Sequence, residues 1–148
     1  MTHLVDWQPI LTDPRISVVN LQYGECEAEI DEVEKLYNCE IIRFSDLDLK
    51  NDLEGSFSLT SALDYVITVG TAVLDIAGAL NISTFALLKD DWIFFGDTKK
   101  YAWYSNVTPC VSRNDELLAI QLIKVHKILD QKIQSLSQES KPIEICNF

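Results

Sequence analysis

The sequence predicts an α/β fold: an open parallel sheet of about four to five strands with helices on both faces. Short apolar runs alternate with amphipathic segments along the 148 residues. Residues 63–80 show this most clearly, because a β-branched run ends at Gly70-Thr71 and apolar residues then recur at helical spacing. This predicts a buried strand that turns directly into a helix, as in parallel α/β sheets.

Strands are expected where short runs are rich in β-branched and apolar residues. Besides the strand before Gly70, these runs are 16–21, 40–44, 84–88 and 107–112. They are separated by predicted helices or by polar connections, which favours parallel strands joined by crossovers.

Helices are expected where apolar residues recur every three or four positions. A short one covers 4–11 and is closed by the Asp13-Pro14 turn, and an acidic one follows Cys26. Asp52 is a plausible N-cap for a helix to about residue 62, because its carboxylate can accept from first-turn N–H groups. A long helix is expected over 118–136. We therefore predict one domain over 1–136 and a flexible tail over 137–148.

Charge and composition exclude several classes of function. Acidic residues number 23 against 12 basic ones, for a net charge of -11. That field opposes nucleic acid and anionic membranes, so neither is an expected partner. The four cysteines form no CxxC pair and there are only two histidines, which predicts reduced thiols in a cytoplasmic protein and no metal site.

Residues 65–88 resemble a membrane-spanning segment in length and hydropathy. They contain a single charge, Asp75, and a bilayer helix needs about 20 residues. Breaks at Gly70-Thr71 and at 81–83 divide the run into strand, helix and strand. We expect no membrane span and no secretory signal.

The Gly70-Thr71 turn is the main candidate site, because the chain lacks the usual dinucleotide, P-loop, triad and zinc-protease motifs. The amino end of a helix that follows a parallel strand attracts phosphate. A structural interpretation is equally open: Gly70 serves backbone geometry and Thr71 caps the helix. Asp75 would oppose an anion by about 1 to 4 kcal/mol at about 4 Å.

Two other clusters have simpler explanations than ligand binding. Asp46, Asp48 and Asp52 lack the glycine and distal glutamate of a calcium loop, so no metal is expected there. The aromatic segment 89–106 contains Trp92, Trp103 and Tyr104, which either stack on a sugar or base or cap the core. The cap is the favoured interpretation.

Several segments occur in the order seen in one enzyme family. They are 20–24, 48–55, 63–64, 77–80, Trp92 and 103–105. In this order the chain resembles heptosyltransferase-like glycosyltransferases, and most of all the glycosyltransferase-like domain at the C-terminus of many bacterial tetratricopeptide-repeat proteins. The resemblance runs from Trp7 to about Arg113 and rests on the joint register of the segments.

This resemblance implies a GT-B architecture, of which the chain is similar to the C-terminal, Rossmann-like, nucleotide-sugar-binding half. It implies that the loops after the first two strands hold the nucleoside and that the strand-turn-helix receives the pyrophosphate. The nucleoside residues are then Gln22, Tyr23, Gly24, Leu49, Lys50, Asn51 and Asp52. The pyrophosphate residues are Gly70, Thr71, Ala72 and Val73, with Asp75 beside them.

The chain also departs from the family pattern. Gly70 stands where the family usually has an acidic residue, Asp75 where it has a histidine, and Ile93 where an arginine often follows the loop tryptophan. We also expect the domain to lack the family's usual first strand and the acceptor-binding half with its catalytic base.

The predicted function is therefore a nucleotide-sugar-binding-type domain that does not catalyse transfer by itself. No catalytic residue and no cofactor is assigned, and a nucleotide sugar is the expected ligand. The alternative is an interaction or scaffold domain that kept the fold and lost the ligand. The expected protein partners are a second copy of the chain or a separate acceptor-binding domain.

Overall fold

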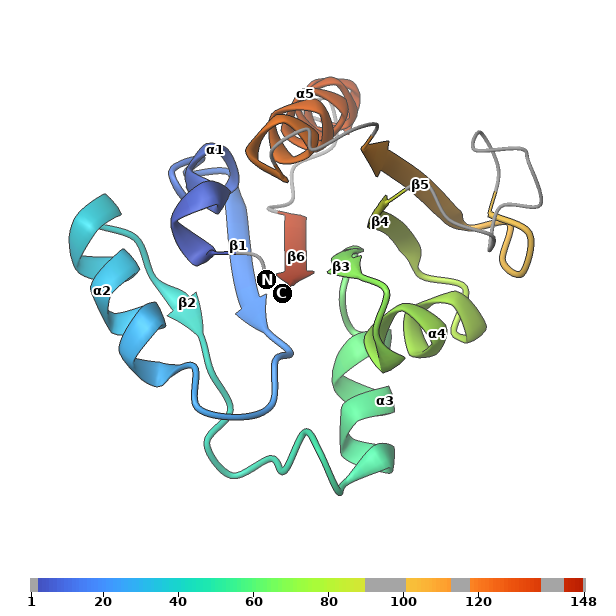
Figure 1. Cartoon of the computed structure of the whole chain (residues 1–148), viewed down its shortest axis with the longest axis horizontal. Coiled ribbons are helices and arrows are strands. Elements are labelled where there is room, and N and C mark those ends of the chain that lie inside the picture. The colour runs from blue at the N-terminus through green and yellow to red at the C-terminus, as the bar shows by residue number, and fades with distance from the viewer. Residues whose placement is uncertain (1–2, 90–100, 113–117, 137–142, 148) are drawn as a thin grey trace.

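The computed structural model describes residues 3–89, 101–112, 118–136 and 143–147. Its centre is one six-stranded parallel sheet in the order β2-β1-β6-β3-β4-β5, which runs across Figure 1. The strands are β1 (Ile16–Asn20), β2 (Ile41–Ile42), β3 (Tyr65–Val69), β4 (Ser83–Lys89), β5 (Val107–Ser112) and β6 (Ile143–Asn147). The predicted open, Rossmann-like α/β class is confirmed.

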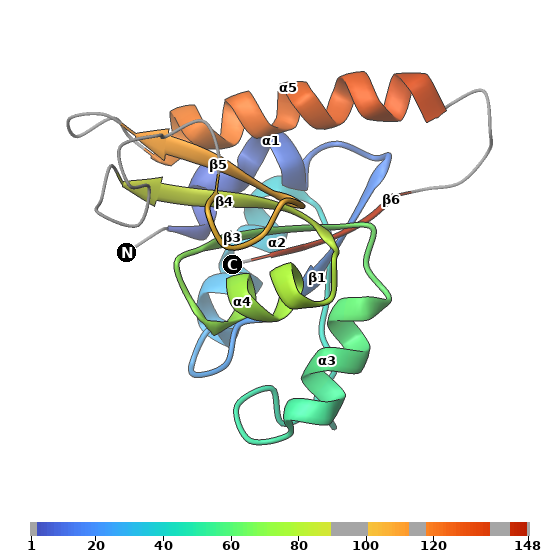
Figure 2. The same ribbon diagram turned by 90° about the vertical axis from the view of Figure 1, so that its right-hand side faces the viewer.

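Helices cover both faces of the sheet. They are the 3-10 turn η1 (Leu4–Trp7), α1 (Gln8–Leu11), α2 (Glu27–Tyr37), α3 (Leu53–Ser61), α4 (Ala72–Ala79) and α5 (Leu118–Leu136). Figure 2 shows α5 lying along one face of the sheet, with α3 and α4 on the other. The N-terminal helices η1 and α1 share the face of α5, since they contact it.

The alternation of side chains along each strand divides the core between the two faces. Val18 and Ile67 pack in the large cluster under α5, whereas their neighbours Val19 and Val66 pack in the cluster under α3 and α4. Strands that are buried on both faces explain the continuous apolar runs in the sequence.

β6 corrects the prediction of a flexible tail over 137–148. Residues 143–147 form a strand between β1 and β3, with Ile16 opposite Ile143 and Tyr65 opposite Ile145. Among the described residues the sheet therefore has six strands rather than the four to five expected, and β6 lies at its centre although it follows the other five in sequence.

Most other predicted elements are found with small shifts at their ends. Asp52 caps α3 as predicted, and its Oδ1 accepts a 2.8 Å bond from the Gly55 N–H. The expected strand 40–44 is reduced to Ile41–Ile42. Within the described residues, no helix has the length and hydropathy needed to span a membrane. Trp92 and Ile93 lie outside the described residues.

Candidate functional site

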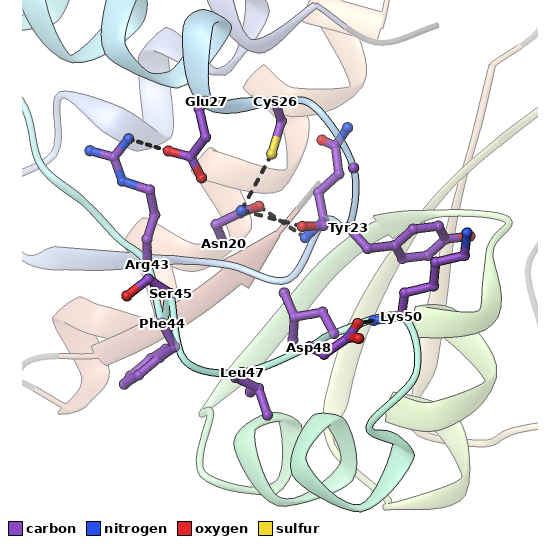
Figure 3. A pocket seen from close by; sticks show the side chains of 13 residues that line it. Asn20, Tyr23, Cys26, Glu27, Arg43, Phe44, Ser45, Leu47, Asp48 and Lys50 are labelled. Atoms are coloured by element: carbon purple, nitrogen blue, oxygen red, sulfur yellow. Dashed lines mark hydrogen bonds and ion pairs between the residues drawn. The ribbon is translucent and has the colours of Figure 1, made fainter.

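A pocket of about 610 Å³ opens where β1 and β2 end at the carboxyl edge of the sheet. This is within the size range of small-molecule sites. It is lined by Asn20, Gln22, Tyr23, Gly24, Cys26, Glu27, Arg43, Phe44, Ser45, Leu47, Asp48, Leu49 and Lys50. Figure 3 shows Arg43 and Glu27 on one side of it, and Tyr23 and Lys50 on the other.

The loop between β1 and α2 is shaped by Asn20. Its buried side chain accepts from the Gln22 N–H at 2.9 Å and donates to Cys26 Sγ at 3.6 Å. Gly24 has a φ of +112°, which a residue with a side chain rarely adopts, so this turn requires glycine. These constraints leave Tyr23 at the pocket as a residue that is 53% exposed.

Arg43 lies at the opposite wall and is neutralised by α2. It donates to Glu27 and Asp31 at 2.9 Å and to Glu34 at 2.8 Å. These three acids follow one another at the spacing of one helix face, and the hydrogen bond to Asp31 is the main cause that raises the pKa of Arg43. The acidic run of α2 therefore has a structural role, and Arg43 offers little net charge to an anion.

The loop between β2 and α3 forms the floor of the pocket. Asp48 accepts from the Lys50 N–H at 3.1 Å and from the Asn51 side chain at 2.7 Å, and the Asn51 bond is the main cause that lowers its pKa. Gly55, in the first turn of α3, lies so close to Leu47 and Asp52 that a Cβ atom would overlap both side chains. The loop is thus held from both ends, with Lys50 exposed at its surface.

The chemistry of the pocket suits a neutral, polar, ring-bearing ligand. Its wall contains Glu27 and Asp48, while its cations are the neutralised Arg43 and the exposed Lys50. An exposed tyrosine offers a stacking surface and the loop carbonyls and amides offer hydrogen bonds. A nucleoside meets this description better than a phosphate group does.

The predicted pyrophosphate residues lie elsewhere. Gly70 to Val73, with Asp75, follow β3 and begin α4, and none of them lines the pocket. Thr71 stands at the N-cap of α4 with an extended backbone, but its side chain makes no cap bond and approaches Thr68 Oγ1 at 3.3 Å instead. β6 separates β3 from β1, so the two halves of the predicted site are on opposite sides of the central strand.

The structure therefore brings together only part of the predicted set. Gln22, Tyr23, Gly24, Leu49 and Lys50 line one pocket. Asn51 and Asp52 come directly after them but serve the turn and the helix cap. The pocket residues that sequence reasoning missed are Asn20, Cys26, Glu27, Arg43, Phe44, Ser45, Leu47 and Asp48. Arg43 was discoverable, because a base at the end of a short strand follows acids at 27, 31 and 34.

Two other clusters were considered in the sequence: the acidic residues Asp46, Asp48 and Asp52, and the aromatic segment 89–106. Within the described residues, no group of three or more histidine, cysteine or acidic side chains could hold a metal ion. Tyr104 stacks on Tyr101 at 6.2 Å and covers the cluster around Leu74 and Val107, as the cap interpretation predicts. Trp103, however, is 63% exposed, so the cap interpretation is wrong for this residue.

The chain is similar in sequence to a curated bacterial protein. A stretch of 102 residues, 68% of this chain, is 38% identical to Protein FlbA of Caulobacter vibrioides. The chain spans only 17% of that protein's length. No protein-family model matches the chain, and no solved structure matches it. The similarity thus covers most of this chain and a small part of its relative.

Proposed function

We propose that this chain is a nucleotide-sugar-binding-type domain of glycosyltransferase ancestry, located in the bacterial cytoplasm, which does not catalyse transfer by itself. The observation that supports this most is the pocket: five residues expected to hold a nucleoside line one cavity of suitable size. The Rossmann-like sheet and the free Cys26, Cys39 and Cys110 are consistent with the proposal.

The proposed binding mode has two parts. The nucleoside occupies the pocket and stacks on Tyr23, and the diphosphate extends toward the amino end of α4, where the helix dipole favours an anion. Transfer itself would need an acceptor-binding partner chain.

Thermal-shift titration with ADP-, UDP- and GDP-sugars tests the proposal. A ligand at 100 times its Kd adds about 2.7 kcal/mol, which is several degrees for a domain of this size. We expect a shift with one nucleotide and its loss in Tyr23→Ala. Leu36→Ala is the matched control, because Leu36 is similarly exposed but lies on α2 outside the pocket lining.

A second variant tests the binding of the diphosphate separately from the binding of the nucleoside. Ala72→Asp places a carboxylate in the exposed first turn of α4, where the helix dipole tolerates it but a diphosphate would be repelled. We expect the shift with the nucleotide sugar to fall and the shift with the free nucleoside to remain. A nucleoside shift that also falls would contradict this binding mode.

A second candidate function is an interaction or scaffold domain. The neutralised Arg43 and the exposed Asp75 in the first turn of α4 favour it, because both weaken attraction for phosphate. Absence of any shift with all three nucleotide sugars and with their nucleosides would leave this function in place of the first.

A further inference from the structure

A carboxylate and a guanidinium lie side by side on one wall of the pocket (Figure 3). The carboxylate is that of Glu27, the first residue of α2, where the helix dipole favours a negative charge. Its Oε2 accepts from Arg43 Nη1 at 2.9 Å, and the side chain is 68% exposed. Within the described residues the Glu27 side chain makes no other hydrogen bond, so its second oxygen can accept from a ligand.

Arg43 supplies hydrogen-bond donors beside this carboxylate. A guanidinium carries five N–H groups, and in the described part of the chain the bonds to Glu27, Asp31 and Glu34 use three of them. The other two can meet an acceptor of the ligand. Since three acids surround one positive charge, the wall is net negative and favours a ligand edge with more donors than acceptors.

The other polar side chains with bonds at the pocket hold its loops in place. Asn20 accepts from the Gln22 N–H at 2.9 Å. Asp48 accepts from the Asn51 N–H at 3.1 Å and from the Asn51 amide at 2.7 Å. Of the two carboxylates that line the pocket, Glu27 is therefore the one with more capacity to bind a ligand.

The common nucleobases differ in what they present to such a wall. Guanine presents two donors, N1–H and the N2 amino group, beside the O6 acceptor. Uracil presents one N–H between two carbonyl oxygens, and adenine and cytosine each present an amino group beside a bare ring nitrogen. A carboxylate accepts from both guanine donors but repels the lone pair of a carbonyl oxygen or ring nitrogen. Guanine therefore matches the paired carboxylate and guanidinium best.

We propose that the pocket is selective for guanine and that Glu27 determines this selectivity. The base stacks on Tyr23 and turns N1–H and the N2 amino group to Glu27 on the opposite side, while O6 accepts from Arg43. The ligand class is then a GDP-sugar. This inference rests on the proposed function, because it specifies which nucleotide occupies the same pocket.

Isothermal titration calorimetry of the full-length chain with GDP, inosine diphosphate, ADP and UDP tests the proposal. Inosine diphosphate lacks only the N2 amino group of GDP, so it removes one of the two bonds to Glu27. We expect GDP to bind at least about tenfold more tightly than each of the other three. In Glu27→Gln we expect GDP to bind at least about tenfold more weakly, and its advantage over inosine diphosphate to shrink.

Asp31→Asn is the matched control. Asp31 also lies on α2 and accepts from Arg43 Nη1 at 2.9 Å, but it does not line the pocket. The side chains of Glu27 and Asp31 are both more than half exposed, so neither change should unfold the chain. We expect Asp31→Asn to keep the affinity for GDP within about threefold. Equal losses in the two variants would overturn the proposal, because the effect would then come from the ion pairs of Arg43.

The outcomes distinguish this proposal from the proposed function. Tighter binding of ADP or UDP that Tyr23→Ala abolishes would overturn the guanine assignment and leave nucleotide binding in the pocket. Binding of GDP that Glu27→Gln leaves unchanged would overturn the role of Glu27. Failure of all four nucleotides to bind would overturn both the guanine assignment and the proposed function.

Discussion

Asp13 lies just before the amino end of β1, at the opposite end of this strand from the pocket. We expect it to stabilise the packing of α5 there. Its buried carboxylate accepts from the Arg15 N–H at 3.0 Å, from Arg15 Nε at 2.9 Å and Nη2 at 2.6 Å, and is 3.0 Å from His126 Nε2. Arg15 also reaches Asp130 of α5 at 2.8 Å. Asp13 therefore connects the turn before β1 to α5 at His126 directly and at Asp130 through Arg15.

The cost of Asp13→Ala follows from these contacts. The Arg15 side chain is 42% exposed, so its ion pair contributes only about 0 to 1 kcal/mol. The bonds with the backbone N–H and with the imidazole contribute about 1 kcal/mol each. We expect a loss of about 2 to 3 kcal/mol in the free energy of unfolding at pH 7, or about 5 to 10 °C in Tm.

Acidification provides a second test of the same contacts. The hydrogen bond from the Arg15 side chain is the main cause that holds the pKa of Asp13 well below its usual value of 3.8. A group with a lowered folded-state pKa stabilises fully above its unfolded-state pKa, and this stabilisation is lost as pH falls through the folded-state value. The difference between wild type and Asp13→Ala should therefore be constant above about pH 5 and shrink below about pH 4.

Urea unfolding followed by circular dichroism at pH 7 and pH 3 measures both effects. Asp46→Ala is the control, because Asp46 is an exposed loop residue whose removal should change stability by less than about 0.5 kcal/mol. A loss below about 0.5 kcal/mol for Asp13→Ala at pH 7, or a difference that grows on acidification, would refute the reasoning.

Three other substitutions test packing and capping. Gly78→Ala should lower the free energy of unfolding by about 1 to 2 kcal/mol, because the new methyl group overlaps the Tyr104 ring. Gly70→Ala is its control: the new methyl group meets only a Leu88 methyl group at 3.4 Å, so the same urea assay should show almost no change. Asp52→Ala should lower stability by about 1 kcal/mol through loss of the α3 cap, and Asp52→Asn should retain most of it. Gln121→Leu should cost about 1 to 3 kcal/mol in thermal unfolding, because the buried amide donates to the backbone carbonyls of Leu88 in β4 and Cys110 in β5.

The parts of the fold that local patterns specify were predictable. The strand before Gly70, the cap at Asp52 and the long helix from Leu118 each depend on residues close together in sequence. β6 was missed because Ile143–Asn147 is short and comes after a long helix, so nothing local distinguishes it from a tail. Its position depends on pairing with residues at the other end of the chain, which propensity does not encode.

Less than half of the candidate site was predictable, for the same reason: five of the thirteen residues that line the pocket were named from the sequence. Gln22 to Gly24 and Leu49 to Lys50, which line the pocket, were predicted as site residues through the family resemblance alone. Arg43 and Glu27 reach the pocket through an ion-pair network between β2 and α2, which depends on how those elements pack. The link between Asp13 and His126 likewise joins distant segments and has no local sequence signal.

The central position of β6 has a consequence for how the chain folds. Ribosomes deliver the chain from its amino end, so β1 to β5 emerge before the strand that must lie in their midst. Pairing of Ile16 with Ile143 closes a loop that contains nearly all of the domain, and such non-local contacts slow folding. We therefore expect the edges of β1 and β3 to stay unpaired in the nascent domain, and accessible to chaperones, until Ile143–Asn147 has been synthesised.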